Sequence, residues 1–176
     1  MLKSSIETIL NQQIAIESTA SYKYLAFASW CDVEGYSGSA KFLYEHSDEE
    51  RFHMMKLFRY INDKGGKSIV PAMAQPRKDF KSLKEVFVCA YESEIEVTEA
   101  INEIAALCLK EADFTTYNFI QWFITEQLEE ENLYRSILDK IKLVGDEGNN
   151  LYLIDAEIEK LCKGSNNPAA GGTAQV

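Results

Sequence analysis

Glu50 and His53 stand three positions apart in the sequence, with Arg51 and Phe52 between them. Residues at that spacing lie on one face of an α-helix, so the carboxylate and the imidazole can reach the same ligand. Oxygen and imidazole donors together are typical of transition-metal sites. His53 alone would also suit a structural histidine, and His46, one turn further out, is expected to be structural or to act behind the ligands. The pair indicates a metal site because further acids face it.

Three more glutamates interrupt apolar stripes as Glu50 does. Alternating steps of three and four along the sequence pick out four stripes, the pattern of helices that turn one face into a core. Each stripe is apolar except near its middle, so its polar groups converge whichever way the helix points. The stripes are Ile6, Leu10, Gln13, Glu17, Ala20, Tyr24, Phe27 and Cys31; Leu43, His46, Glu50, His53, Leu57 and Tyr60; Phe87, Ala90, Glu94, Val97, Ile101, Ile104 and Cys108; and Ile120, Phe123, Gln127, Glu130, Tyr134, Ile137, Ile141 and Val144.

Four carboxylates that face one another in a core require a compensating positive charge. An isolated ionised carboxylate in a low-dielectric interior is so costly that it normally takes up a proton. A metal ion supplies the charge instead. Oxygen-rich coordination with a single imidazole suits iron, and two irons bridged by a carboxylate would use this many ligands. The candidate ligands are Glu17, Glu50, His53, Glu94 and Glu130, together with Gln127, three residues before Glu130.

Each of these residues also has a simpler interpretation. A single glutamate on such a stripe can be a side chain that reaches solvent at a helix edge. Tyr24, two turns beyond Glu17, can be a core aromatic, or its phenol can bond a ligand or donate an electron. The acidic run from Glu126 to Glu131 can be a solvated face, and we expect this of Glu131. The complete set of residues is a more specific indication of a metal site than any one of them.

The helices that must hold these residues follow from start and stop signals. Ser82 and Glu85 have the S-x-x-E form of a capping box, in which each side chain satisfies a free backbone N–H. Asp113 is the expected N-cap of the fourth helix, and Gly145 closes it. Glycines at 35 and 38 separate the first two helices. The predicted helices span about 5–33, 37–65, 82–110, 113–144 and 150–162.

Residues 66–81 contain Pro71 and Pro76 and no helical period, which predicts an extended connection. At about 3.3 Å per residue it reaches roughly 50 Å, comparable with a long helix. It can therefore run the length of a bundle and leave the second and third helices parallel. The predicted fold is all-α: a four-helix bundle with one long crossover between helices two and three and a short fifth C-terminal helix. Residues 1–164 should form one domain and 165–176 a flexible tail.

Composition and charge exclude several functions. The 176 residues, 46% hydrophobic and 26% charged, suffice for one core. The net charge of −10 disfavours binding to nucleic acid or to anionic membranes. No apolar run approaches the ~20 residues of a membrane span, and the N-terminus does not resemble a signal region, so we expect a cytoplasmic protein. The four cysteines, at 31, 89, 108 and 162, have no C-x-x-C spacing and are expected to be reduced, mostly buried thiols.

From Met1 to about Leu161 the chain resembles the bacterial non-haem ferritins of the ferritin A type. The residues that carry the likeness are Glu17 with Tyr24, the block Glu49-Glu50-Arg51-Phe52-His53, Glu94, the stretch Asn118-Phe119-Ile120-Gln121-Trp122, and Glu126-Gln127-Leu128-Glu129-Glu130.

The resemblance implies a di-iron centre and a third iron beside it. The first iron would be held by Glu17, Glu50 and His53. The second would be held by Glu94, Glu130 and a bridging Glu50, with Gln127 close by. The third would be held by Glu49, Glu126, Glu129 and the shared Glu130.

The function implied by the resemblance is iron storage with ferroxidase activity. Fe²⁺ would be oxidised by O₂ or H₂O₂ at the di-iron centre and stored as ferric oxyhydroxide inside a shell of 24 subunits, with the fifth helix near the four-fold axes. No haem is expected, because bacterioferritins have a methionine after the second-helix glutamate and a second Glu-x-x-His on the fourth helix, where this chain has Arg51 and the pair Gln127 and Glu130. Two other functions stay open: a di-iron oxidase or oxygenase acting on an organic substrate, which requires an apolar pocket beside the metals, and a metal-free structural bundle.

Overall fold

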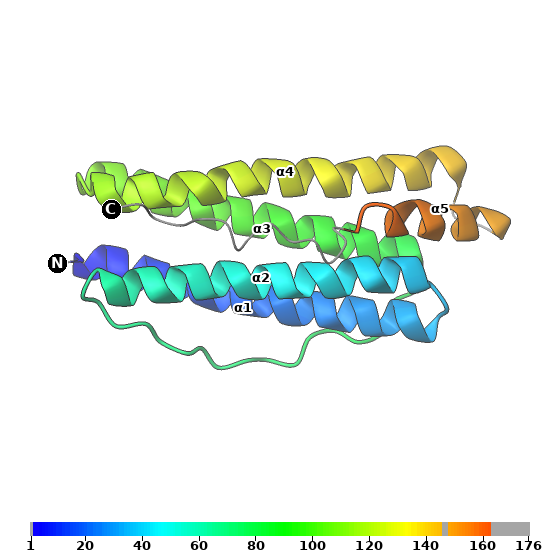
Figure 1. Ribbon diagram of the computed structural model, residues 1–176, viewed down its shortest axis with the longest axis horizontal. Coiled ribbons are helices and arrows are strands. Elements are labelled where there is room, and N and C mark those ends of the chain that lie inside the picture. Colours follow the sequence, from blue (N-terminus) through cyan, green and yellow to red (C-terminus); the bar gives the residue numbers. More distant parts are fainter. Residues whose placement is uncertain (1, 146–147, 163–176) are drawn as a thin grey trace, which may run out of the picture.

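The computed structural model describes residues 2–145 and 148–162, which form five helices and no strand. The all-α prediction is confirmed. The four long helices begin and end within two residues of their predicted limits, whereas α5 ends at Glu159, before the predicted end at Cys162. The tail predicted for 165–176 lies outside the described residues. The helices are α1 (Ser4–Val33), α2 (Ser37–Asp63), α3 (Leu83–Lys110), α4 (Phe114–Val144) and α5 (Asn149–Glu159) (Figure 1).

The long helices form two antiparallel pairs joined by the extended connection. Short turns connect α1 to α2 and α3 to α4, and the chain from α2 to α3 runs the length of the bundle, so these two helices are parallel (Figure 1). Asn11 of α1 binds the connection at two points. Its amide donates to the Lys67 carbonyl (3.0 Å), and its side-chain oxygen accepts from the Ile69 N–H (2.8 Å). The predicted crossover is confirmed.

Side-chain caps set the starts of α3 and α4. Ser82 accepts a hydrogen bond from the Glu85 N–H (3.2 Å), and Asp113 accepts one from the Thr116 N–H (3.0 Å), as predicted. The second half of the capping box differs from the expectation. The Glu85 carboxylate accepts from the N–H of Lys81 (2.6 Å), one residue before the cap, because it also binds Arg77 in the connection (2.8 Å).

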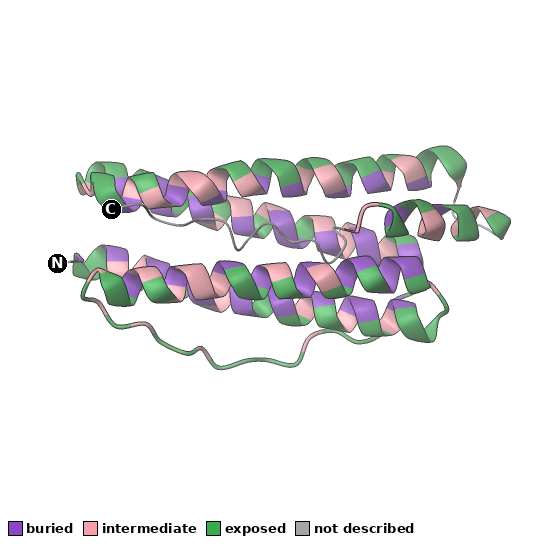
Figure 2. Ribbon diagram, in the orientation of Figure 1, coloured by how far each residue is buried: buried purple, intermediate pink, exposed green. Residues whose placement is uncertain are grey.

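The interior of the bundle is two apolar clusters with a polar layer between them. One cluster contains Tyr24, Phe42, Phe87 and Tyr134, and the other contains residues such as Leu10 near the opposite end. Figure 2 shows that buried positions follow one stripe along each long helix. None of the described helices combines the length and apolar character needed to cross a membrane. The buried polar layer consists of Gln13, Glu17, His46, Glu50, His53, Glu94, Gln127 and Glu130.

The short helix α5 packs against the first turn of α2. The carboxylate of Asp155 accepts hydrogen bonds from the N–H groups of Gly38 (2.9 Å) and Ser39 (2.7 Å) and from the Ser39 hydroxyl (2.6 Å). These N–H groups have no partner within their own helix, and a negative charge at a helix N-terminus is favourable. A Cβ atom at position 38 would come within 2.4 Å of the Asp155 carbonyl oxygen, so only glycine allows this approach.

Candidate metal centre

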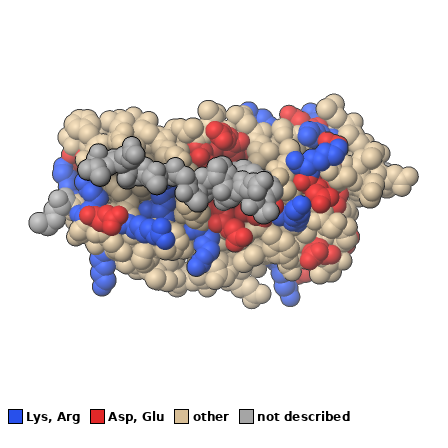
Figure 3. Space-filling view, viewed as in Figure 1, with Lys and Arg blue, Asp and Glu red and all other residues tan. Residues whose placement is uncertain are grey.

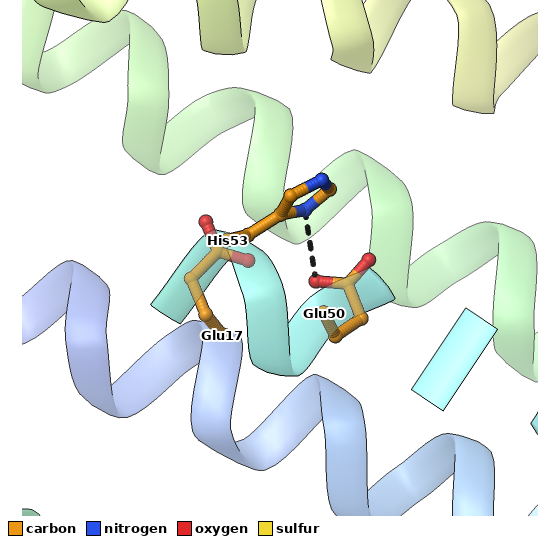
Figure 4. A group of neighbouring side chains, drawn as sticks. All are labelled: Glu17, Glu50 and His53. Atoms are coloured by element: carbon orange, nitrogen blue, oxygen red, sulfur yellow. Dashed lines mark ion pairs between the residues drawn. The ribbon is translucent and has the colours of Figure 1, made fainter. Parts of the chain in front are cut away.

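Three of the predicted ligands meet between α1 and α2. Glu17 comes from α1, and Glu50 and His53 come from successive turns of α2 (Figure 4). All three side chains are buried, and one ligand atom from each lies within 4.8 Å of the others. The interval of three residues on α2 and the inward stripe of α1 produce this meeting, as the sequence predicted.

Several ligand atoms in this group have no hydrogen-bond partner among the residues that the structure describes. They are one carboxylate oxygen each of Glu17 and Glu50 and both ring nitrogens of His53, whose Nδ1 lies 3.6 Å from Glu50 Oε2. Burial raises the pKa of Glu17 and of Glu50 well above the usual value, and the charges of Glu50 on Glu17 and of Glu94 on Glu50 raise them further. Without metal, protons therefore replace part of the negative charge. A cation in the centre would take over their role.

Gln13 fixes the orientation of Glu17. Its amide nitrogen donates to Glu17 Oε1 (2.9 Å) from one turn earlier on α1, and this bond leaves the other oxygen of Glu17 free to face Glu50. The sequence placed Gln13 on the inward stripe but assigned it no role. The spacing of four residues between an amide and a carboxylate on one stripe is the signal that could have found it.

Aromatic rings hold the imidazole of His53. The rings of Trp122 and Phe123 on α4 contact it edge to face, with centroids 5.4 Å and 6.0 Å from that of the imidazole. Lys56, one turn further along α2, covers the Trp122 ring at 4.1 Å. Packing on two sides fixes the ring plane, so His53 presents the same nitrogen without a hydrogen bond to orient it.

Glu94 is oriented by two donors. The Tyr24 hydroxyl donates to one carboxylate oxygen and the Gln127 amide donates to the other (3.0 Å). Burial and the charge of Glu130 raise the pKa of Glu94 from 4.5 to about 7, although the two donors oppose the rise. Glu94, Gln127 and Tyr24 are thus brought together as predicted, and Tyr24 contacts a candidate ligand directly.

Glu130 faces His46, a contact that the sequence did not predict. His46 Nε2 lies 3.4 Å from Glu130 Oε2, and its Nδ1 lies 2.9 Å from the Phe42 carbonyl, to which it donates. Burial lowers the pKa of His46, but the hydrogen bond and charge of Glu130 raise it above the usual value overall. His46, Glu49 and Glu130 form a second group whose ligand atoms all lie within 4.8 Å. His46 therefore stands behind a ligand, one of the two roles expected for it.

The acids of the predicted third site lie on the outer side of the centre. Glu49 and Glu126 are half-buried and form a group with His53 within 4.8 Å, whereas Glu129 is exposed and belongs to none of these groups. Figure 3 shows acidic side chains near the middle of the face formed by α2 and α4. The carboxylates thus extend from the buried centre towards the surface.

Known proteins are similar to this chain over most of its length. The protein-family model described as "Ferritin-like domain" matches residues 7–144, which include every residue of the centre. The chain belongs to the ferritin family. A "Probable bacterial non-heme ferritin-like protein" of Haemophilus influenzae is 42% identical to this ferritin over 161 residues, 92% of this chain and 98% of that protein. A "Bacterial non-heme ferritin" of Campylobacter jejuni is 41% identical, over 92% and 96% of the two chains.

Solved structures agree with this assignment. An open pore ferritin from the archaeon Archaeoglobus fulgidus superposes on this ferritin with a TM-score of 0.88 at 33% identity, over 90% of this chain and 98% of that one. A closed form of the same archaeal ferritin, engineered by mutagenesis, gives a TM-score of 0.87. The resemblance inferred from the sequence and the four-helix bundle are therefore both confirmed.

Proposed function

We propose that this ferritin stores iron and is a ferroxidase: it oxidises Fe²⁺ with O₂, or with H₂O₂, and keeps the Fe³⁺ product as ferric oxyhydroxide. The observation that carries the proposal is the set of buried ligand atoms on Glu17, Glu50 and His53 that lack a hydrogen-bond partner within the described part of the chain. Buried polar atoms are normally satisfied, and an oxygen-rich set with one imidazole suits iron. The names of the bacterial relatives support the same function.

The first Fe²⁺ would bind between α1 and α2. Ligands on opposite sides of an ion with bonds of about 2.1 Å lie roughly 4.2 Å apart, and the atoms of Glu17, Glu50 and His53 lie within 4.8 Å. Small side-chain movements therefore suffice to close the site. Because the raised pKa values leave protons on the carboxyl groups, binding of Fe²⁺ releases protons into the centre.

The second Fe²⁺ would bind Glu94 and Glu130, with Glu50 as the bridge. Tyr24 and Gln127 already orient Glu94. One carboxylate oxygen of Glu130 would bind this iron, and His46, which lies 3.4 Å from Glu130 Oε2, would stabilise the carboxylate. Carboxylate oxygens favour Fe³⁺ over Fe²⁺, so this ligand set promotes oxidation. Two Fe²⁺ supply two electrons, and with two protons they convert one O₂ to H₂O₂.

A third iron would bind Glu49 and Glu126, with Glu129 and the shared Glu130. The change from buried Glu130 to half-buried Glu126 and exposed Glu129 makes each successive position easier to hydrate. Fe³⁺ bound there is held less firmly than at the dinuclear centre. The site therefore serves both as a source of a third electron and as the way out for the product.

The storage function requires a closed assembly, for which we propose a shell of 24 identical subunits in the cytoplasm. Large apolar side chains such as Phe114 and Leu128 are more than half exposed in the single subunit. Such surfaces mark contacts with other chains. Sedimentation should show a particle of hundreds of kilodaltons, and a monomer or dimer under native conditions would contradict storage.

An oxidase of organic substrates would require a cavity at the metals. One surface cavity, of about 550 Å³, is lined by Arg51, Lys56 and Arg59 of α2 and by Phe119 of α4. None of the four buried glutamates lines it. This cavity gives the alternative no support.

The direct test is iron oxidation by metal-free protein reloaded with Fe²⁺. Consumption of O₂ and formation of Fe³⁺ should be fast in the wild type and lost in Glu50→Ala, which removes the bridging ligand, while the particle still assembles. Glu103→Ala, which removes an exposed acid of α3, is the matched control and should oxidise iron normally. Fast oxidation in Glu50→Ala would refute the proposed centre.

A further inference from the structure

Tyr134 is a fully buried tyrosine whose hydroxyl has no hydrogen-bond partner among the described residues. It lies on α4, one turn beyond Glu130, in the aromatic cluster beside the polar layer. Its ring stacks on that of Tyr24, with centroids 5.9 Å apart and planes inclined by 27°. The rings of His46 (5.5 Å) and Phe42 (5.9 Å) pack against it edge to face.

Packing alone does not explain the hydroxyl. A phenylalanine would make the same ring contacts without burying an unsatisfied polar group, and leaving such a group unsatisfied costs stability. Burial and the charges of Glu130 and Glu94 raise the pKa of Tyr134 well above the usual value, so the phenol keeps its proton. The neighbouring hydroxyl of Tyr24 opposes this rise of the pKa.

Tyr24 links Tyr134 to the centre. Its hydroxyl donates to Glu94, a proposed iron ligand, while its ring stacks on Tyr134. Glu94, Tyr24 and Tyr134 therefore form a continuous series from the metal position into the apolar cluster. Tyr134 can pass an electron to an oxidised Tyr24, because an oxidised tyrosine is reduced by a neighbouring phenol in ring contact, and Glu94 connects Tyr24 to the metal position.

We propose that Tyr134 is a second electron donor of the ferroxidase centre, which reduces Tyr24 after Tyr24 has given an electron to O₂. This inference rests on the proposed function. Complete reduction of one O₂ to two H₂O takes four electrons and four protons. Three Fe²⁺ give three electrons, and Tyr24 gives the fourth together with its hydroxyl proton, which leaves a neutral tyrosyl radical; the other three protons come from the carboxyl groups and solvent.

The radical then moves to Tyr134. Tyr134 transfers one electron and its hydroxyl proton to the Tyr24 radical, so Tyr24 regains its O–H bond and Tyr134 becomes the neutral radical. No other reactant is needed in this step. A later Fe²⁺, with a proton from solvent, reduces Tyr134 again and becomes Fe³⁺. The transfer at once restores the Tyr24 hydroxyl, which donates to Glu94. The radical then resides on Tyr134 in the apolar cluster, away from the next O₂.

The test compares Tyr134→Phe with the wild type in the assembled, metal-free protein. Fe²⁺ is loaded without O₂, an O₂ pulse is given, and frozen samples are examined by electron paramagnetic resonance while released H₂O₂ is measured. We expect the wild type to form tyrosyl radicals at two positions with different spectra. Tyr134→Phe should show only the Tyr24 spectrum, at most about half the radical per subunit, and more H₂O₂ after the first O₂, with an unchanged initial rate of Fe²⁺ oxidation.

Two controls make the result decisive. Tyr60→Phe alters a tyrosine that stacks on Phe119 and donates to Thr116, away from the centre, and should match the wild type. Tyr24→Phe should remove both spectra. The melting temperature of Tyr134→Phe should equal or exceed that of the wild type, since it loses only an unsatisfied hydroxyl.

Three results would overturn the inference. They are identical radical yields and spectra in wild type and Tyr134→Phe, a Tyr134 spectrum that persists in Tyr24→Phe, and rapid iron oxidation without any tyrosyl radical. Absence of iron oxidation in the wild type would overturn the proposed function itself, and with it this inference.

Discussion

Glu94 is the acid of the centre for which the effect of burial on stability can be worked out most directly. Burial and the charge of Glu130 raise its pKa from 4.5 to about 7. An acid with a raised pKa binds more protons in the folded protein than in the unfolded chain between these values, so the free energy of unfolding falls as the pH rises through this window. A difference of that size is worth about 3 kcal/mol above the higher pKa.

Glu94→Gln removes the ionisation and keeps the shape of the side chain. Tyr24 can still donate to its oxygen, while the Gln127 amide must turn to accept from the new NH₂ and gives up its bond to the carbonyl of residue 94. One lost hydrogen bond costs about 1 kcal/mol. We therefore expect the metal-free variant to be more stable than the wild type by about 2 kcal/mol near pH 8, which corresponds to roughly 4–8 °C in Tm.

Thermal unfolding of chelator-treated protein, followed by circular dichroism near pH 5 and near pH 8, measures this difference. The gain should be present near pH 8 and absent near pH 5, where Glu94 of the wild type is protonated. Glu103→Gln, at an exposed position of α3, should change neither value. A Glu94→Gln protein that melts below the wild type near pH 8, or gains equally at both pH values, would refute the argument. Anaerobic Fe²⁺ should raise the Tm of the wild type more than that of the variant.

Three further predictions concern the surroundings of the centre. Replacing Glu126 and Glu129 together with Ala should lower the iron bound per subunit and change the Fe²⁺ oxidised per O₂, measured with an oxygen electrode; unchanged values would mean that these acids are only a solvated face. Gln13→Leu, which removes the donor to Glu17, should weaken the first Fe²⁺ site about fivefold in anaerobic calorimetry, and an unchanged affinity would count against its positioning role. Asp155→Ala removes the hydrogen bonds to the start of α2 and should lower stability by about 1–2 kcal/mol in thermal unfolding without slowing iron oxidation; an unchanged Tm would show that α5 is held by packing alone.

The sequence predicted the fold and the meeting of Glu17, Glu50 and His53 for the same reason. Helical periodicity fixes which residues share a face, and long helices with short turns leave few ways to assemble the faces. The height of each acid along its helix then decides whether they meet. These are properties of spacing, which a single sequence contains in full.

Contacts that depend on side-chain rotamers were not predictable in this way. The pairing of His46 with Glu130 needs two rotamers that face each other across separate helices. Glu85 binds the Lys81 N–H because Arg77, placed by the connection, competes for its position. In each case a partner from outside the local sequence decides between geometries that the local pattern allows equally.

Because the connection between α2 and α3 is long, the two halves of the metal centre form earlier in folding than the complete centre. Short turns let α1 with α2, and α3 with α4, form early as local hairpins, whereas bringing the hairpins together closes a long loop and comes later. Glu17, Glu50 and His53 belong to the first hairpin, and Glu94, Gln127 and Glu130 belong to the second. Each hairpin already holds one repelling pair, Glu17 with Glu50 or Glu94 with Glu130, and docking adds the repulsion between Glu50 and Glu94. A metal ion bound by the first hairpin would offset this added repulsion, and so speed the late step and slow its reversal.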